Sequence, residues 1–391
     1  MKVCILSSFE DSLSKDTGYS VRMYNLAKGL AKLGHEVHFV MPNYGVGYNR
    51  FGGINVYYVR GFLPREILAF LSMLLGVAKT SSLYFYDPIF VFKVSKIIRG
   101  ADIVQIEQQS AGGIIVPIIA KVWKKTIIVD CHDVFQALRI KHVNRIRRVI
   151  ETFLETITYR FADFFITVSD NEKKVLVSYG IENNRIEVIP NGVDTEHFSD
   201  CSRIDSRLVK RRYGLENFKV VVFVGNMEYL PNKEAAELVV STIAPKVVDK
   251  VHDVKFLIIG RHQQDFNVNS PNIFFTGVVD DVAKLLIPSD LAIAPLLHGS
   301  GTRLKVVEYF SAGLPVISTT IGVEGLDVCN GVDVIIEDDV NNFASKIIEL
   351  LEDEDRRTKI GSSARLLALE KYDWRTITEK LDTFLRVVLN F

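Results

Sequence analysis

The feature that most constrains the fold is a repeated alternation of short β-branched runs with longer segments of helical periodicity. The chain opens with a strand pattern at Val3 to Ser7, an amphipathic helix pattern at Val21 to Leu33 and a second strand pattern at Val37 to Met41. Further strands are expected at Ile103 to Ile106, Thr126 to Val129, Phe164 to Val168 and Ile186 to Ile189. This alternation predicts an α/β fold with parallel strands covered by helices on both faces.

The second half of the chain starts the same pattern again. Its expected strands are Val220 to Val224, Lys255 to Ile259, Ile273 to Thr276, Leu291 to Ala294, Val316 to Ser318 and Val334 to Ile336. A length of 391 residues also exceeds what one hydrophobic core usually serves. The turn residues Pro190 to Asp194 and the polar stretch that follows through Asp205 are typical of a linker. We therefore expect two doubly wound domains, 1–200 and 201–374, with ligands in a cleft beyond the carboxyl ends of their strands.

Composition excludes several classes of protein. The 47 basic residues balance 47 acidic ones, so no overall charge attracts the chain to nucleic acid. Its four cysteines form no Cys-x-x-Cys pair, which argues against a zinc motif or a disulfide framework and favours the reducing cytoplasm. The apolar run Ile67 to Ala78 spans 12 residues, too few to cross a bilayer.

The stretch from His298 to Pro315 has the sequence of an anion site. A glycine-rich loop follows the strand Leu291 to Ala294 and leads directly into a helix. Gly299 and Gly301 allow the backbone to approach a ligand closely, and the N–H groups of the first helical turn point toward it. This layout alone is equally compatible with an ordinary glycine-capped surface helix, since it matches no established phosphate-loop motif.

Charged side chains on the same helix fit a nucleoside diphosphate. Arg303 and Lys305 place two positive charges where a diphosphate would bind. Glu308 lies one turn further on and could accept two hydrogen bonds from a ribose diol. The alternative is a solvated Glu–Lys pair.

These segments together resemble the family 4 retaining glycosyltransferases, which have the two-domain Rossmann-like fold called GT-B. The resemblance runs along nearly the whole chain, through short motifs in a specific order. They are Gly34-His35-Glu36-Val37, Cys131-His132-Asp133, Thr167-Val168-Ser169, Val188 to Asp194, Phe223-Val224-Gly225, Thr276 to Val279, Glu308 to Val316 and Tyr372-Asp373-Trp374.

The resemblance implies roles for individual residues. Glu308 would hold the donor ribose, His132 would contact the donor sugar, and the backbone around Val278 would receive the base. A glycine loop ending at Gly18 would face the same cleft, and a final helix, 375–391, would return to complete the N-terminal domain. The expected catalytic residues are His132, Arg303, Lys305 and Glu308, and the expected donor-binding residues are Gly18, Gly225, Asn226, Val278, Ser300, Gly301 and Thr302.

Two departures from the family pattern change the expected role of the helix that begins near Arg303. Ser300 stands where the family usually has its first glutamate, and Asn226 and Pro231 replace the usual arginine and lysine. Without that pair, Arg303 and Lys305 would have to bind the diphosphate themselves. A subset of the family similar to this chain carries Gly-x-Gly-Thr-Arg-x-Lys at this place.

The resemblance implies transfer of a hexose, with retention, from a UDP- or GDP-linked sugar to a hydroxyl of a glycan, a lipid-linked acceptor or a small molecule, as in polysaccharide biosynthesis. We expect no cofactor and no metal, because no Asp-x-Asp pair follows a strand and fixed cations would serve instead. Alternatives are an epimerase or phosphorylase on the same fold, or a non-catalytic subunit that binds nucleotide sugars.

A peripheral contact with the inner face of the membrane is a further alternative. It would combine the Ile67 to Ala78 run with a basic cluster, although that cluster is equally compatible with a solvated helix face. The cluster consists of Arg139, Lys141, Arg145, Arg147 and Arg148.

Overall fold

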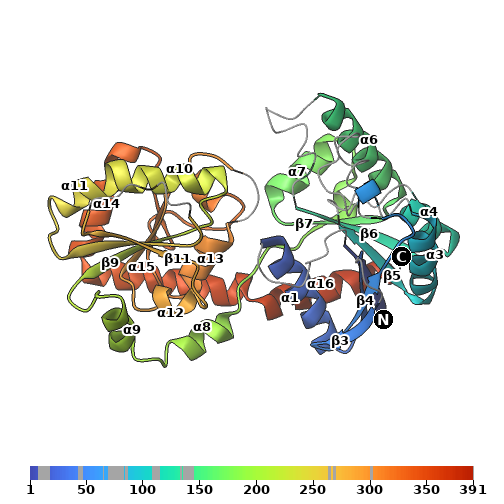
Figure 1. The fold of residues 1–391 in the computed structure, drawn as a ribbon, viewed down its shortest axis with the longest axis horizontal. Helices are drawn as coiled ribbons and strands as arrows, with labels where there is room; N and C mark the ends of the chain where they lie inside the picture. The colour runs from blue at the N-terminus through green and yellow to red at the C-terminus, as the bar shows by residue number, and fades with distance from the viewer. Residues whose placement is uncertain are drawn as a thin grey trace. The chain divides into compact units, whose positions relative to one another are not determined.

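The computed structural model contains two compact α/β units (Figure 1). It describes residues 1–7, 18–42, 47–64, 66–68, 83, 87–107, 115–132, 134, 145–262, 266, 270–299 and 303–390. Unit 1 comprises Met1–Pro190 and Ile377–Phe391, and unit 2 comprises Asn191–Thr376. No described helix combines the length and the apolar content needed to cross a bilayer.

Unit 1 is built on an eight-stranded sheet in the order β3-β4-β2-β1-β5-β6-β7-β8. All neighbouring strands are parallel except β3 and β4, which form an antiparallel pair at one edge. The strands are β1 (Lys2–Leu6), β2 (Glu36–Pro42), β3 (Gly47–Phe51), β4 (Ile54–Val59), β5 (Ile103–Glu107), β6 (Thr126–Cys131), β7 (Phe164–Thr167) and β8 (Ile186–Val188). The strand order reverses between β1 and β5, which is where a doubly wound sheet opens a crevice for ligands.

The described helices of unit 1 are α1 (Gly18–Lys32), α3 (Pro88–Gly100), α4 (Ile115–Val122), α6 (Arg145–Phe161) and α7 (Asp170–Ser178). Helix α16 (Trp374–Leu389) joins them from the far end of the chain. It packs closely on α1, because a Cβ added at Gly29 would lie 2.3 Å from Thr378 Oγ1. His35 Nε2 lies 2.7 Å from Asp382 Oδ1 of α16. His35, which belongs to the motif Gly34-His35-Glu36-Val37, therefore helps to hold α16 on unit 1.

Unit 2 contains a parallel six-stranded sheet in the order β11-β10-β9-β12-β13-β14. Its strands are β9 (Lys219–Val224), β10 (Val254–Ile259), β11 (Ile273–Gly277), β12 (Leu291–Ala294), β13 (Val316–Ser318) and β14 (Ile335–Ile336). Its α-helices are α8 (Thr195–Cys201), α9 (Ser206–Arg212), α10 (Leu230–Leu238), α11 (Ala244–Val248), α12 (Ala283–Leu286), α13 (Leu304–Ser311), α14 (Val340–Glu352) and α15 (Glu354–Leu367). The order reverses between β9 and β12, so the switch point lies between their carboxyl ends.

Both faces of the central strands of the unit 2 sheet are buried, which explains why these strands are mostly apolar. Val221 and Phe223 of β9 pack in one core with α10, α11 and α14. Val220 and Val222 face the other side and pack in a second core with α8, α12 and α13. The ribbon shows α10, α11 and α14 together on one side of the sheet (Figure 1). The alternation follows the two-residue period of a strand.

The predicted fold class, two doubly wound α/β domains, is confirmed. The strands predicted from periodicity correspond to those of the structure, but β3 and β4 were missed. Gly47 to Phe51 is exposed along its whole length and therefore carries no apolar signal. The units divide after Pro190, earlier than the predicted 200, because the segment expected to be a linker contains α8, whose Phe198 packs in the core of unit 2.

Candidate functional site

Helix α13 begins at the switch point of unit 2. Strands β9 and β12 are neighbours in the sheet, and the chain leaves them for opposite sides of the sheet. The segment after β12 leads into α13, so the positive end of this helix lies where doubly wound sheets bind their ligands. Ser300, Gly301 and Thr302 lie outside the described residues.

Arg303 and Lys305 are held at the start of α13 by different contacts. Arg303 is 7% exposed, and its Nε donates to the carbonyl oxygen of Ile321 at 3.2 Å. Lys305 Nζ donates to Asn232 Oδ1 at 2.6 Å and lies 4.5 Å from the centre of the Phe223 ring. Both cations are therefore positioned before any ligand is bound, as binding a diphosphate at low entropic cost requires.

Two glycines leave room for these cations. A Cβ added at Gly299 would lie 3.0 Å from both terminal nitrogens of Arg303, and the φ of Gly299 is 135°. A Cβ added at Gly225 would lie 3.0 Å from Lys305 Nζ. The loops after β9 and β12 thus both approach α13, and each depends on having no side chain there.

Asn226 lies in the loop after β9, beside Gly225, and its side chain hydrogen-bonds within that loop. Its Oδ1 accepts the backbone N–H of Glu228 at 3.0 Å, and its carbonyl oxygen accepts Asn232 Nδ2 at 3.0 Å. Asn232 thereby links the loop after β9 to Lys305. Asn232 was not predicted from the sequence, although its place at the start of the helix after β9 was an available signal.

The surroundings of Lys305 and Glu308 disfavour the charged form of each. Both keep part of their surface open, but protein atoms enclose most of each side chain. Burial, and secondarily the charge of Arg303, lowers the pKa of Lys305 to about 7. Burial raises the pKa of Glu308 to about 7, against an opposing effect of Lys305. Glu308 makes no hydrogen bond or ion pair within the part of the chain that the structure describes.

Tyr309 fixes the position of α13 against the sheet, a role that the sequence analysis missed. Its hydroxyl oxygen accepts the backbone N–H of Val224 at 2.7 Å, and the residue is fully buried. Burial raises the pKa of this hydroxyl. A tyrosine on the buried face of a short helix was the available signal, because a buried phenol needs a partner.

Two further predicted residues lie at the same edge of unit 2. Val278 follows β11 directly and is 70% exposed. His298, in the loop after β12, pairs with Glu234 of α10. Neither observation assigns a ligand, and the role of Val278 stays a prediction.

Unit 1 contains a second group of charged residues, near the carboxyl ends of β5 and β6. Arg22 of α1 and Asp130 of β6 are both fully buried. Their two contacts are Nη2 to Oδ1 at 3.0 Å and Nε to Oδ2 at 3.2 Å, which makes the ion pair bidentate. Arg22 Nη1 also donates to the carbonyl oxygens of Ile189 and Pro190 at 2.8 and 2.9 Å.

His132 lies beside this ion pair. Its Nε2 is 2.9 Å from Glu107 Oε2 and 3.8 Å from Asp130 Oδ1. Burial lowers the pKa of His132, but the charges of Asp130 and Glu107 outweigh it, so the pKa is raised. Burial, together with the charge of Asp130, raises the pKa of Glu107 to about 7. The pKa values of both residues are therefore raised, and each residue affects the titration of the other.

His132 was predicted from its sequence motif, whereas Arg22, Glu107 and Asp130 were not. The signal was present, since Glu107 and Asp130 are charged residues within otherwise apolar strands, and such residues are buried only with partners. The ligand atoms of Glu107, Asp130 and His132 lie within 4.8 Å of one another, a spacing that a metal could use. Arg22 already binds both oxygens of Asp130, so we interpret the group as an ion-pair network.

Gly18, the predicted end of a glycine loop, begins α1, and residues 8–17 lie outside the described residues. The next residue, Tyr19, packs edge-on against the His132 ring with centroids 5.4 Å apart. Its hydroxyl lies 2.6 Å from Ser7 Oγ, at the end of β1. The start of α1 is therefore joined to the His132 group, although no ligand contact of Gly18 is established.

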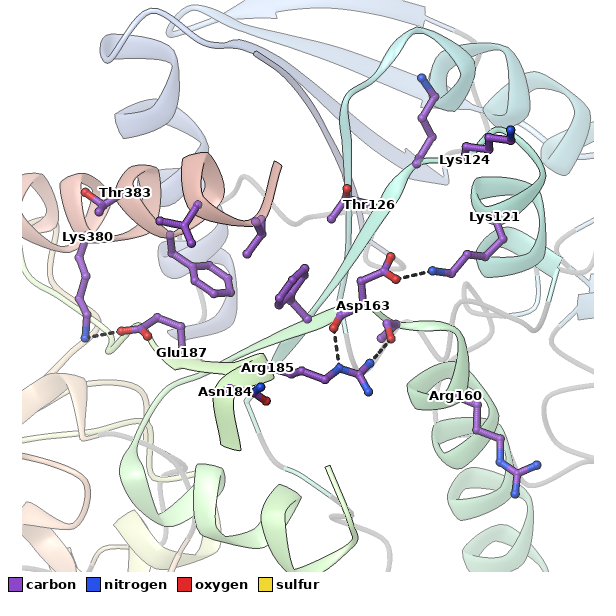
Figure 2. Close-up of a pocket in the computed structure, with 16 residues that line it drawn as sticks. Lys121, Lys124, Thr126, Arg160, Asp163, Asn184, Arg185, Glu187, Lys380 and Thr383 are labelled. Carbon is purple, nitrogen blue, oxygen red and sulfur yellow. Dashed lines mark hydrogen bonds and ion pairs between the residues drawn. The ribbon is translucent and has the colours of Figure 1, made fainter. Parts of the chain in front are cut away.

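A separate cavity of about 1260 Å³ lies in unit 1 at the amino ends of strands β6 and β7, opposite to the end that holds the His132 group. Its walls include Thr126 and Phe164, the first residues of β6 and β7, and Phe384 of α16. Figure 2 shows Arg185 bonded to the backbone of this wall and Lys380 paired with Glu187. Because it lies at the amino ends of the strands, this cavity is not the site predicted from the sequence.

Family models match both units. The model for Glycosyltransferase Family 4 matches residues 17–197, and the model for Glycosyl transferases group 1 matches residues 218–353. The second match contains the switch point and α13. The chain belongs to the glycosyltransferases.

Individual relatives of this glycosyltransferase are distant. It is 29% identical over 203 residues to the phosphatidyl-myo-inositol mannosyltransferase of Mycolicibacterium smegmatis, covering 49% of this chain and 50% of the relative. It is 25% identical over 273 residues to the capsular polysaccharide biosynthesis glycosyltransferase CapM of Staphylococcus aureus, covering 65% and 69%. These alignments span about half to two thirds of each relative's length.

A solved structure extends the likeness to the entire fold. The crystal structure of Anabaena HepE in complex with UDP has a TM-score of 0.73 and 17% sequence identity, covering 99% of this chain and 100% of that one. At this sequence identity the likeness establishes the fold of the glycosyltransferase but not its donor or acceptor.

Proposed function

We propose that this glycosyltransferase moves a hexose from a nucleoside diphosphate sugar to an acceptor hydroxyl. The observation that carries the proposal is the set of charges on α13. Arg303 and Lys305 lie at the positive end of the helix at the switch point, and Glu308 lies on the next turn without a hydrogen bond among the described residues. A diphosphate would supply the counter-charge that Lys305 lacks there, and a ribose diol would supply donors to Glu308.

The transfer step follows from the same charges. As the bond from the sugar to the diphosphate breaks, negative charge grows on the departing diphosphate. Arg303, Lys305 and the N–H groups at the start of α13 would stabilise that charge, which is the largest contribution such a site can make. The proposal needs no metal for this step and includes retention at the anomeric carbon, as the family resemblance implies. The role of His132 toward the donor sugar stays a prediction.

UDP- and GDP-linked sugars are the proposed donors, and glycans or lipid-linked sugars are the proposed acceptors. Support comes from the relatives, because one is a phosphatidyl-myo-inositol mannosyltransferase and another is named for capsular polysaccharide biosynthesis. HepE was crystallised with UDP.

The experiment that tests the proposal has two steps. First, a thermal-shift screen of nucleotide sugars identifies the donor, since at one concentration a tighter-binding ligand raises the melting temperature more. Second, release of nucleoside diphosphate from that donor is measured with and without a panel of acceptors. Release that requires an acceptor supports transfer. Donor binding with no release across the panel would favour a non-catalytic binder, and acceptor-independent isomerisation of the sugar would favour an epimerase.

We also propose a peripheral membrane contact. Val149 and Phe153 lie one turn apart on α6 and are 63% and 58% exposed, in a segment whose sequence includes Arg145, Arg147 and Arg148. Apolar side chains beside basic ones suit the surface of an anionic membrane. Arg139, Lys141 and almost all of the Ile67 to Ala78 run lie outside the described residues. Flotation with anionic liposomes at low and high salt tests this, and equal recovery at both salts or no recovery would contradict it.

A further inference from the structure

Three potential metal ligands meet on the surface of unit 2, away from α13. His197 and Cys201 are four residues apart on α8, so both point from the same face of the helix. Asp281, in the segment just before α12, lies against that face. Their ligand atoms all lie within 4.8 Å of one another. None of the three belongs to the donor site argued above.

The distances among these atoms are close to those of a tetrahedral site, with His197 and Cys201 contacting different oxygens of Asp281. His197 Nε2 lies 3.1 Å from Asp281 Oδ1 and 3.7 Å from Cys201 Sγ, and Cys201 Sγ lies 3.6 Å from Asp281 Oδ2. Zinc binds nitrogen and oxygen at about 2.0–2.2 Å and sulfur at about 2.3 Å. At tetrahedral angles, those bond lengths separate nitrogen from oxygen by about 3.4 Å and sulfur from either by about 3.6 Å. A small displacement of the His–Asp pair would therefore suffice.

We propose that His197, Cys201 and Asp281 form a binding site for a borderline divalent cation, with Zn²⁺ as the best fit. One imidazole, one thiolate and one carboxylate are ligands that zinc accepts together. The His197 side chain is 48% exposed, which leaves solvent access for water as the fourth ligand. The absence of a Cys-x-x-Cys motif does not bear on such a site, because Asp281 is 80 residues from Cys201 in sequence.

The bound ion would fasten α8 to the segment that connects β11 to α12. Asp281 already accepts the backbone N–H of Ala283 at 3.1 Å, so the carboxylate is oriented by its own loop. The exposed Val278 lies three residues before Asp281 in that loop. The ion would thus brace the loop without touching Arg303 or Lys305, and the proposal is independent of how the transfer reaction proceeds.

Cobalt titration of the full chain tests the site directly. Co²⁺ occupies zinc sites, and a thiolate ligand gives it a charge-transfer band in the near ultraviolet. Metal-free protein should bind one equivalent of Co²⁺ with this band, and Zn²⁺ should displace it. His197→Gln and Asp281→Asn should each weaken binding by at least about 100-fold, since loss of outer-shell partners alone typically costs about 10–100-fold.

The matched control is Cys329→Ser. Cys329 is exposed and free, so it is the alternative source of a cobalt–thiolate band. Retention of the band in Cys329→Ser and its loss in Cys201→Ser support the site. If no band forms, if the band disappears in Cys329→Ser, or if it survives in His197→Gln at wild-type affinity, the proposal is wrong. Because His197 is half-exposed and Asn preserves the cap on Ala283, these variants should fold, which circular dichroism checks.

Discussion

The two groups of charged residues, one in each unit, are built on opposite principles. In unit 1, Arg22 and Asp130 form a bidentate buried pair, and His132 faces Glu107. In unit 2, the hydrogen-bond partner of Lys305 among the described residues is the neutral amide of Asn232. The unit 1 charges balance one another within the protein. Among the described residues Lys305 and Glu308 of unit 2 make no ion pair, and the difference indicates where an external charged ligand belongs.

The pKa shifts follow this contrast for Lys305 but not for every acidic group. Lys305 and Glu308 both have pKa values shifted to about 7 by burial, toward the neutral form of each side chain. Neither charge is sufficiently compensated by protein. Glu107 also has a raised pKa, for a further reason, because a second carboxylate, that of Asp130, lies close to it. Such uncompensated charge is typical of functional sites, which hold it at a cost in stability.

The strongest way to break the comparison is to remove one charge from unit 1. Asp130→Asn leaves the Arg22 guanidinium buried without its counter-charge, and breaking a buried pair costs about 3–5 kcal/mol. Hydrogen-exchange protection of β1, β5 and β6 measures this loss within unit 1. The control is Glu237→Gln in the exposed Lys233–Glu237 pair, at 3.9 Å, where we expect less than about 0.5 kcal/mol. A loss no larger than that of the control would contradict the account.

The corresponding change in unit 2 should have the opposite sign. Lys305→Met keeps the length of the side chain and removes a charge that the folded protein disfavours. The pKa of Lys305, lowered from 10.5 to about 7, means that folding at neutral pH costs about 4 kcal/mol at this residue. Loss of the charge-assisted hydrogen bond to Asn232 offsets about half of this, so the variant should gain about 2 kcal/mol. Exchange protection of β9 and β12 provides the measurement. Destabilisation of these strands would show that Lys305 is a structural residue.

Glu308 should distinguish ribose from deoxyribose. A carboxylate that binds the ribose diol loses a hydrogen bond when the 2′-hydroxyl is absent, which amounts to about tenfold in affinity. The wild type should therefore prefer a ribonucleoside diphosphate to its 2′-deoxy analogue by about that factor, and Glu308→Ala should bind both alike. Calorimetric titration of the two ligands gives the ratio. An unchanged preference in the variant would place the ribose elsewhere.

Donor affinity should fall as the pH rises above 7. Lys305 binds the diphosphate only when it is protonated, and with a pKa of about 7 its protonated fraction falls about fivefold between pH 7 and pH 8. The diphosphate of a nucleotide sugar does not itself titrate in this range. Lys305→Arg should remove the decline, because arginine stays charged. The same decline in both proteins would assign it to another group.

Much of the fold could be predicted because burial on both faces makes the central strands mostly apolar. Val220 to Val224 is visible in the sequence for this reason, whereas Gly47 to Phe51 is exposed and has no such pattern. The start of α13 was also predictable, because a glycine-rich loop followed by Arg303 and Lys305 is a pattern of neighbouring residues in the sequence.

Partners brought together by the fold could not be predicted. Arg22 and Asp130 are 108 residues apart, and Lys305 and Asn232 are 73 apart, so no local spacing connects them. Their strands and helices were identified, but the register that aligns them depends on the packing of the whole sheet. A charged residue inside an otherwise apolar strand, such as Asp130, indicates that it has a buried partner but does not indicate which residue that partner is.

The central claim is that α13 supplies the cations that bind the donor diphosphate. The most direct measurement is calorimetric titration of a nucleoside diphosphate into Arg303→Ala/Lys305→Ala, beside the exposed-site control Arg203→Ala/Lys250→Ala. Loss of two charge-assisted interactions should weaken binding by at least about 100-fold in the first variant and leave the control at wild-type affinity. Wild-type affinity in Arg303→Ala/Lys305→Ala would contradict the claim.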